Sequence, residues 1–451
     1  MRPRTRELVE LDRRHVWHPF TQMQGWMKDE EVVVIEEGGG FWLQDTEGRR
    51  YLDGISSLWC NVHGHRVEAI DRAVREQLDR VAHSTLLGLA NVPSIELAAR
   101  LAAIAPQGLT RVFYSDAGAT AVEAALKIAF QCQAQRGERQ RTRFAALGAA
   151  YHGDTVGGVS LGGIEVMHGV FDPLRFETVR LPSPNCYRCP LELERASCSM
   201  DCADEAERIL ADNAATLAGL VIEPLVQGAA GIIVHPAGYL ARVRAACDRL
   251  GLLLVADEVA VGLGRTGSLF ACSQEQVTPD LLCLAKGLSG GYLPLAATLA
   301  TEEVFEAFLG PHDEYRAFFH GHTFTGNPLG CAAALASLDL LEDELPRLRD
   351  KISLLGTLLD ERVAGLRHVG DVRQRGMMVG IELVQERETK KPYPTAWRMA
   401  HRVILEARSR GVIIRPLGDV VVLMPALGMA EEELDLLVHA TARAIHTVTE
   451  G

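Results

Sequence analysis

The feature that most constrains the fold is a series of short apolar runs that alternate with amphipathic helical segments from about Val67 onward. The apolar runs of strand length are TRVFYS, TRFAALG, LAGLVIEP, LGLLLVADEV, DLLCLAK and LPLAATLA. Segments before and between them, such as HRVEAIDRAVREQLDRVAH and YLARVRAACDRL, carry apolar residues at helical spacing. Apolar strands separated by helices predict right-handed βαβ crossovers and a mainly parallel sheet with helices on both faces. We therefore expect an α/β fold.

The pattern changes towards both ends of the chain. From about Val369 it reads MMVGIEL, GVIIRP and VVVLMP, followed by a last helix in EEELDLLVHATARAIH. The first 65 or so residues mix short β-like runs with Gly-rich turns. We expect a large domain at 66–345, with an inserted loop at about 184–203, and a small α+β domain at 346–451. The N-terminal segment, 1–65, is expected to pack with the small domain.

Composition limits the classes of partner. The 451 residues, 47% of them hydrophobic, suffice for one large core and smaller lobes. A formal net charge of −13 argues against nucleic acid and anionic membranes as general partners, and leaves small molecules. No stretch approaches the roughly 20 apolar residues of a membrane span, and the basic start lacks the apolar core of a signal peptide. We expect a cytoplasmic protein.

A candidate phosphate site lies in SDAGATAVEAALK, between a predicted strand and a predicted helix. Gly118 and Ala119 are small, so a ligand can approach the backbone closely there. The first turn of a helix offers unpaired N–H groups and the positive end of the helix dipole, which suit a phosphate. The alternative is a plain strand–turn–helix connection with small residues for packing. A P-loop is excluded, because G-x-x-x-x-G-K-[ST] is absent.

Asp257 and Lys286 form a candidate catalytic pair. Asp257 ends the apolar run LLLVADEV, and Lys286 ends the next run, 29 residues later, before GLSGG. Ligands of open α/β sheets bind at this edge, outside the carboxyl ends of the strands. A desolvated lysine can form a Schiff base with pyridoxal phosphate (PLP), and a carboxylate facing the pyridine nitrogen keeps that nitrogen protonated. The alternative is a buried ion pair with a structural role. Together with the phosphate site, the pair predicts a PLP enzyme.

Motifs along nearly the whole chain then resemble a known family. SDAGATAVEAALK, YHGDT, VIEP, VADEV, GLGRTG, CLAKGLSGG and HTFTGNPLGCAAA resemble, in this order, the class III aminotransferases of fold type I. The resemblance implies the PLP-dependent transferase fold, with a mainly parallel seven-stranded sheet. Within the class, WHPFTQM, DGISSLWCNVHGH, AHSTLLG and IIRPLGDVVVLMP resemble the transaminases of biotin biosynthesis, which convert 8-amino-7-oxononanoate to 7,8-diaminononanoate.

The resemblance implies roles in cofactor binding. Lys286 would carry PLP and move the proton between substrate and cofactor, and Asp257 would pair with the ring nitrogen. Gly118 and Ala119 would bind the phosphate through backbone. Tyr151 would stack on the ring, with a core aromatic as the alternative. His322 and Thr323 would reach the phosphate in the neighbouring subunit, which implies a homodimer with shared active sites; the alternative for His322 is a loop histidine.

The resemblance also implies a substrate site. Arg415 would pair with the substrate carboxylate, although a surface ion pair is the alternative, and Glu223 has either a donor-handling or a structural role. The other substrate-site residues it implies, besides Tyr151 and Lys286, are Phe20, Leu58, Trp59 and Gly321.

The amino donor stays open at the level of sequence. Many family members use S-adenosylmethionine and have Tyr at the position of Phe20 and a second Trp at the position of Leu58. Phe20 lacks the hydroxyl and Leu58 offers no aromatic face, a pattern that resembles a subgroup with lysine as donor. S-adenosylmethionine is the expected donor, with lysine as the alternative. An ω-amino acid or diamine transaminase of the same class is a further alternative.

A cysteine cluster stands apart from this chemistry. Cys186, Cys189, Cys198 and Cys202 form a C-x2-C-x8-C-x3-C pattern, which suits a structural zinc or an iron–sulfur cluster. Free thiols or a disulfide are the alternatives. Two further classes of function compete with the enzyme: a PLP-fold binding protein without turnover, which the intact Lys286 and Asp257 disfavour, and a nucleotide-binding dehydrogenase. The dehydrogenase lacks support, because no G-x-G-x-x-G joins a strand to a helix.

Overall fold

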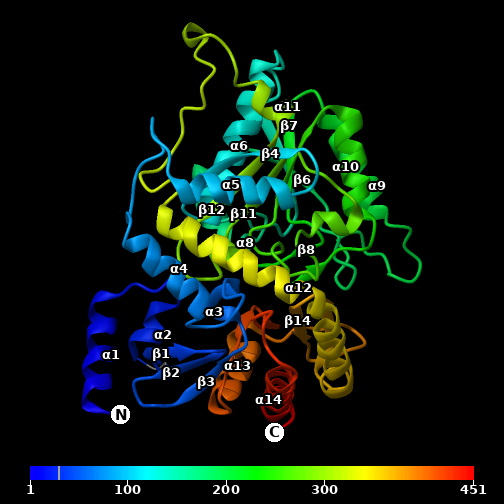
Figure 1. Ribbon diagram of the computed structural model, residues 1–451. Coiled ribbons are helices and arrows are strands. Elements are labelled where there is room, and N and C mark those ends of the chain that lie inside the picture. Colours follow the sequence, from blue (N-terminus) through cyan, green and yellow to red (C-terminus); the bar gives the residue numbers. More distant parts are fainter. Residues whose placement is uncertain (29–30) are drawn as a thin grey trace.

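The computed structural model describes residues 1–28 and 31–451 and has two lobes (Figure 1). The large lobe is built on a seven-stranded sheet with the order β4-β12-β11-β10-β7-β5-β6. In chain order its strands are β4 (Leu109–Ser115), β5 (Arg143–Leu147), β6 (Thr178–Leu181), β7 (Leu217–Ile222), β10 (Leu253–Asp257), β11 (Leu281–Leu284) and β12 (Ala296–Thr301). The predicted α/β fold with a mainly parallel seven-stranded sheet is confirmed.

One strand departs from the parallel pattern. β12 runs antiparallel to both of its neighbours, β11 and β4, whereas the pairs from β11 to β6 are parallel. Between β11 and β12 the chain forms only a short 3₁₀ turn, Lys286–Ser289, and a few further residues. A parallel return needs a crossover of a dozen or more residues, usually with a helix. The short connection therefore returns the chain antiparallel.

Helices cover both faces of the sheet, as β10 illustrates. Leu253 and Val255 belong to the core under α6 (Gly118–Gln135), while Leu254 and Ala256 belong to the core on the other face. Successive side chains of a strand point to opposite faces, so both faces of an apolar strand need cover. The opposite core includes residues of α5 (Val92–Ile104), α9 (Asp201–Asn213) and α10 (Tyr239–Leu250).

The small lobe contains two four-stranded sheets and both chain termini (Figure 1). One sheet joins β1 (Ile35–Gly39), β2 (Trp42–Asp45), β3 (Arg50–Asp53) and β15 (Val412–Ile413). The other joins β13 (Val369–Arg375), β14 (Met378–Leu383), β17 (Val420–Leu423) and β16 (Arg415–Leu417). Because β15 pairs in parallel with β3, the two ends of the sequence share one sheet.

The remaining helices frame the lobes. α12 (Pro328–Arg362) runs from the large lobe into the small one, and the Asn327 side chain caps its first turn by accepting from two backbone N–H groups. In the small lobe lie α1 (Pro3–His15), α2 (Met23–Lys28), α13 (Met399–Ser409) and α14 (Glu431–Glu450), while α4 (Glu68–Leu78) lies against α12. None of the helices within the described residues has the length and apolar character of a membrane span.

Candidate active site

A cavity of about 850 Å³ opens at the carboxyl edge of the seven-stranded sheet. Its wall takes residues from the segments that follow β4, β5, β7, β10 and β11, the edge at which open α/β sheets bind ligands. Candidate residues on the wall are Leu58, Trp59, Gly118, Ala119, Tyr151, Glu223, Asp257 and Lys286. The fold thus brings together side chains that lie up to 228 positions apart in sequence.

Asp257 lies at the end of β10 and is 5% exposed. Its Oδ1 accepts a hydrogen bond from Val259 N at 3.0 Å, and its Oδ2 lies 2.7 Å from His152 Nδ1. A buried carboxylate is costly unless hydrogen bonds compensate the lost water. Because the carboxylate also lines the cavity, it can accept from a cationic ring N–H placed there.

Lys286 follows β11 and reaches the same cavity. Burial lowers the pKa of its ammonium group, and the negative charges of Asp257 and Glu223 partly oppose this effect. Its Nζ lies 5.3 Å from the centre of the Trp59 ring. A lysine with a lowered pKa supplies the neutral amine that attacks an aldehyde or accepts a proton near neutral pH.

The first turn of α6 closes another part of the wall. A Cβ at Gly118 would lie 2.5 Å from Val259 Cγ1, so only glycine allows Val259 to approach this turn without a shift. Gly153, at φ +104°, passes so close to Ala119 that a Cβ there would meet the Ala119 Cβ at 2.4 Å. The tight backbone packing leaves the N-terminal end of an 18-residue helix facing the cavity. Such an end binds phosphate.

Tyr151 and Glu223 are linked at the next part of the wall. Tyr151 donates its backbone N–H to Glu223 Oε2 at 3.2 Å and its hydroxyl to Asp154 Oδ2 at 2.7 Å. Burial, followed by the hydrogen bond to Asp154, raises the pKa of the Tyr151 hydroxyl. Glu223 also accepts from Gly228 N at 2.8 Å, and burial raises its pKa to about 7. The chain therefore holds a carboxyl that changes charge near neutral pH beside Lys286.

The segment that carries Leu58 and Trp59 has a strained backbone. Ser56, Ser57 and Trp59 have φ values of +51°, +59° and +66°, a region that side chains other than Gly rarely adopt. The Ser56 hydroxyl donates to Met424 O at 2.7 Å and so ties the segment to the small lobe. Trp59 is buried, and its Nε1–H has no partner among residues 1–28 and 31–451. This residue of the cavity wall therefore carries a buried donor that the described part of the protein does not use.

Five predicted residues lie away from this cavity wall within one subunit. Phe20 is 61% exposed on the loop between α1 and α2, and Arg415 begins β16 on an exposed edge. Arg415 forms no ion pair with any residue that the structure describes, so the predicted surface ion pair has no partner there. The other three residues, which lie on the segment between β12 and α12, are Gly321, His322 and Thr323. Of these, His322 lies nearest to the wall, with its Nδ1 3.8 Å from Oδ2 of the cavity-lining Asp116.

His152 was absent from the sequence-based prediction. It follows Tyr151 in YHGDT, lines the cavity, and contacts Asp257. The only signal in the sequence was its place beside a predicted ring-stacking residue; its contact depends on the order of strands in the sheet.

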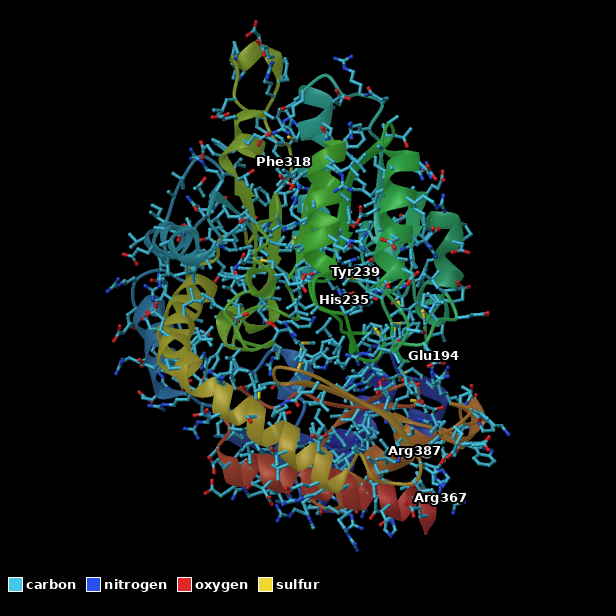
Figure 2. The ribbon with its side chains drawn as sticks, turned by 90° about the vertical axis from the view of Figure 1, so that its right-hand side faces the viewer. Glu194, His235, Tyr239, Phe318, Arg367 and Arg387 are labelled. Atoms are coloured by element: carbon cyan, nitrogen blue, oxygen red, sulfur yellow. The ribbon has the colours of Figure 1, made fainter. Side chains whose placement is uncertain are left out.

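Three of the four cysteines lie in the inserted loop before α9, and Cys202 lies in the first turn of α9. Cys186, Cys189, Cys198 and Cys202 are free thiols that line one cavity of about 270 Å³. Figure 2 labels Glu194, which belongs to this loop, and shows that the loop lies beside the small lobe. Across the described residues, no group of three or more His, Cys, Asp or Glu side chains is placed to hold a metal ion. The metal stays a prediction without structural support.

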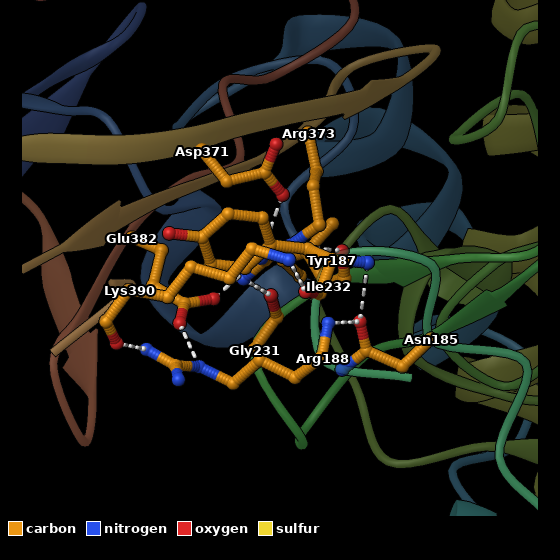
Figure 3. A network of polar contacts seen from close by, with 9 residues as sticks. All are labelled: Asn185, Tyr187, Arg188, Gly231, Ile232, Asp371, Arg373, Glu382 and Lys390. Carbon is orange, nitrogen blue, oxygen red and sulfur yellow. Dashed lines mark hydrogen bonds and ion pairs between the residues drawn. The ribbon is translucent and has the colours of Figure 1, made fainter. Parts of the chain in front are cut away.

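The same loop is bound to the small lobe by a polar network (Figure 3). Arg188 lies between Cys186 and Cys189 in the sequence. It donates from Nε to Glu382 Oε1 at 2.5 Å and to Lys390 O at 2.9 Å. Arg373 of β13 shares Glu382 and donates to the carbonyls of Gly231 and Ile232 at 2.8 and 3.1 Å. The network therefore joins β13 and β14 to two loops of the large lobe.

Comparisons with known proteins agree with this architecture. The adenosylmethionine-8-amino-7-oxononanoate aminotransferase of Nitratidesulfovibrio vulgaris is 60% identical over 451 residues, covering 99% of this chain and 83% of that protein. The crystal structure of the enzyme of that name from Methanocaldococcus jannaschii matches with a TM-score of 0.94 and 43% identity, covering 98% of this chain and 99% of that one.

A PLP-bound structure is also similar. An amine transaminase from an uncultivated Pseudomonas species, solved in its PLP-bound form, matches with a TM-score of 0.91 and 37% identity, covering 96% of this chain and 99% of that one. The family model for class-III aminotransferases matches residues 26–445. Since that match spans nearly the whole sequence, the chain is an enzyme that belongs to the class-III aminotransferases.

Proposed function

We propose that this enzyme transfers an amino group to the ketone of 8-amino-7-oxononanoate and forms 7,8-diaminononanoate, a step of biotin biosynthesis. The relatives with 60% and 43% identity carry this acceptor in their names. The observation that carries the proposal is that Lys286, Asp257 and the first turn of α6 all line the cavity of about 850 Å³. These are the groups that a pyridoxal aldehyde, its ring nitrogen and its phosphate require.

The residues present fit PLP. When bound, PLP supplies an aldehyde that exchanges amines and a ring that accepts an electron pair. Asp257 would accept a hydrogen bond from the ring nitrogen, Gly118 and Ala119 would bind the phosphate through N–H groups, and Tyr151 would stack on the ring. Lys286 would take the proton from the donor substrate at Nζ and return one to the acceptor, which its lowered pKa favours.

Substrate binding would use residues of the cavity wall together with residues that lie outside it within one subunit. Arg415 has no ion-pair partner among the described residues, so its guanidinium is available to the substrate carboxylate in a bidentate arrangement. The cavity-lining Leu58 and Trp59, together with Phe20 and Gly321, would enclose the substrates.

The enzyme is proposed to act as a homodimer with shared active sites. Gly321, His322 and Thr323 lie on the segment between β12 and α12, which also exposes Phe319 by 75% and Phe324 by 55%. Large apolar side chains on an extended segment favour cover by another surface. The second subunit would receive this segment, so that His322 and Thr323 reach its phosphate.

Two further proposals concern organisation. We place the large domain at 66–345 and the small domain at 346–451 together with 1–65, which the pairing of β15 with β3 supports. A structural zinc or iron–sulfur cluster at the four cysteines is also proposed. Elemental analysis of the purified enzyme tests it, and the absence of stoichiometric zinc or iron would remove the idea.

S-adenosylmethionine is the proposed amino donor, and lysine is the alternative. A half-reaction tests both. The PLP-loaded enzyme is mixed with one donor at a time, without acceptor, and the loss of the visible cofactor absorbance is followed. Rapid loss with S-adenosylmethionine supports the proposal, whereas loss with lysine alone assigns that donor. If ω-amino acids or diamines react and neither of these donors does, the biotin-pathway assignment fails. Lys286→Ala serves as the control and should show no reaction with any donor.

A further inference from the structure

One oxygen of the Asp257 carboxylate lies within hydrogen-bonding distance of a buried histidine. His152 Nδ1 lies 2.7 Å from Asp257 Oδ2, and the side chain of His152 is 0% exposed. The two residues are 105 positions apart, and β7 separates their strands in the sheet. The loop after β5 therefore crosses the end of β7, where Tyr151 N binds Glu223, before it reaches β10. Such a specific crossing points to more than space filling.

The hydrogen-bonding roles follow from the partners. An ionised carboxylate only accepts, so His152 Nδ1 carries the hydrogen and donates it. His152 Nε2 is buried and has no partner among residues 1–28 and 31–451. The ring therefore makes one polar contact with the described part of the protein, and that contact is with Asp257.

The geometry decides where the free side of Asp257 faces. Val259 N and His152 Nδ1 occupy one position on each carboxylate oxygen. Asp257 and His152 both line the cavity, so the remaining acceptor positions are available to a ligand inside it.

We propose that His152 is a positioning residue for the cofactor: its Nδ1–H holds the Asp257 carboxylate in the orientation in which its remaining acceptor positions meet the PLP ring nitrogen. This inference rests on the proposed PLP binding and assigns a role that acts through Asp257. Loss of the donor allows the carboxylate to rotate, and this change weakens its bond to the ring nitrogen. Both cofactor binding and its electron-accepting power then fall.

Variants at position 152 separate this role from mere packing. His152→Asn can keep a donor near the position of Nδ1, whereas His152→Leu removes it at similar volume. We expect His152→Leu to raise the Kd for PLP about 10-fold, to shift the visible absorbance of the bound cofactor, and to slow the half-reaction, while His152→Asn stays within about 3-fold of wild type. Cofactor-free protein is titrated with PLP, and spectra are taken of the loaded enzyme.

A matched control comes from a second buried histidine near the same tyrosine. The His168 ring centre lies 6.1 Å from that of Tyr151, but its Nδ1 accepts from Ile164 N. His168→Leu should lower the Tm without shifting the cofactor spectrum. If His152→Leu does not fold, His152→Gln, whose donor lies beyond the Nδ1 position, replaces it and should also shift the spectrum.

Equal Kd values and spectra for His152→Asn and the donor-deficient variant would overturn the inference. Failure of the proposed function looks different, because the PLP readouts need no particular donor or acceptor. A wild-type enzyme that binds PLP but does not use 8-amino-7-oxononanoate loses only the substrate assignment. A wild-type protein that binds no PLP refutes both.

Discussion

Glu223 is the residue whose environment makes the clearest link to pH. Burial raises its pKa from 4.5 to about 7, and Asp257 adds to this effect, while the charge of His152 and the N–H groups of Gly228 and Tyr151 oppose it. Because the pKa in the folded protein lies above the ordinary value, the unfolded chain releases the proton first as pH rises. The stability that Glu223 contributes is complete below about pH 4.5 and is lost as pH rises through about 7.

Glu223→Gln should therefore make the protein less sensitive to pH. In cofactor-free protein, the Tm of wild type should fall relative to the variant between about pH 5 and about pH 8, by an amount equivalent to roughly 3 kcal/mol. Thermal unfolding at several pH values measures this difference. Glu361→Gln, at an exposed position, is the control and should follow wild type throughout. Parallel curves for Glu223→Gln and wild type would contradict the expected titration.

At the residue level, the sequence predicted the positions of those site residues that directly end or follow a strand. Asp257 and Lys286 could be placed at one edge because each ends an apolar run, and parallel strands meet their carboxyl ends on one side. The partner of Asp257 could not be predicted, since its contact with His152 depends on β7 lying between β5 and β10. If a second subunit completes the site, as proposed, the surroundings of exposed residues such as Phe20 depend on it, and a single sequence carries no geometry for that surface.

At the scale of elements, the N-terminal turn of α6 offers the sharpest test. Gly118→Ala places a methyl group about 2.5 Å from Val259 Cγ1, so either the side chain or the turn must move. Overpacking of this kind costs about 1–3 kcal/mol. We expect a Kd for PLP roughly 10-fold higher, because the displaced turn carries the N–H groups proposed for the phosphate.

Val259→Ala supplies the matched control for this clash. Combined with Gly118→Ala, it removes the methyl group that the new Cβ meets, and PLP affinity should return towards that of Val259→Ala alone. PLP titrations of the three cofactor-free variants give the comparison. No recovery in the double variant would mean that the loss comes from the helix backbone and not from this contact.

The arginines of the network in Figure 3 should contribute unequally to the free energy of unfolding. The Arg373 side chain is 9% exposed and satisfies Glu382 and two carbonyl groups of the large lobe, whereas Arg188 is 39% exposed. Removing a buried partner leaves uncompensated polar groups, while an exposed ion pair contributes little. Arg373→Ala should thus lose about 2–4 kcal/mol of stability, and Arg188→Ala about 1 kcal/mol or less.

Denaturant unfolding of the two arginine variants provides the measurement, and activity at low denaturant monitors the active site. A larger loss for Arg188→Ala than for Arg373→Ala would contradict the expected order. The sequence could not predict this network. Its residues come from β13, β14 and three loops, and none of these segments has a pattern that indicates its neighbour.

For helices and strands, local patterns in the sequence predicted their positions, but the direction of a strand depended on the rest of the fold. Helical spacing predicted a helix in 65–83, and the structure has α4 at Glu68–Leu78, shorter at both ends. The apolar run LPLAATLA predicted the strand β12, but its antiparallel direction comes from the short link after Lys286. Periodicity reports which residues are buried, while the length and course of a connection decide the direction.

At the scale of the whole molecule, the segment between β12 and α12 contributes no residue to the cavity wall of its own subunit. Its Phe319 and Phe324 side chains are largely exposed, and Gly321 and Thr323 line no part of the cavity described above. If the segment completes the active site of a second subunit, each site combines Lys286 of one chain with Thr323 of the other. Two defective chains can then restore one intact site between them.

Mixed dimers of Lys286→Ala and Thr323→Ala chains test this arrangement. In the mixed dimer, one site contains both substitutions, and the other combines an intact Lys286 with an intact Thr323 from the partner. Purified by two different tags, the mixed dimer should show about half of the wild-type activity, although each parent dimer is impaired at both sites. If Thr323 acts within its own subunit, every chain with Lys286 also carries the Thr323→Ala change, and activity stays at or below half that of the Thr323→Ala parent. The two arrangements therefore predict activities that differ by the full effect of the Thr323 substitution.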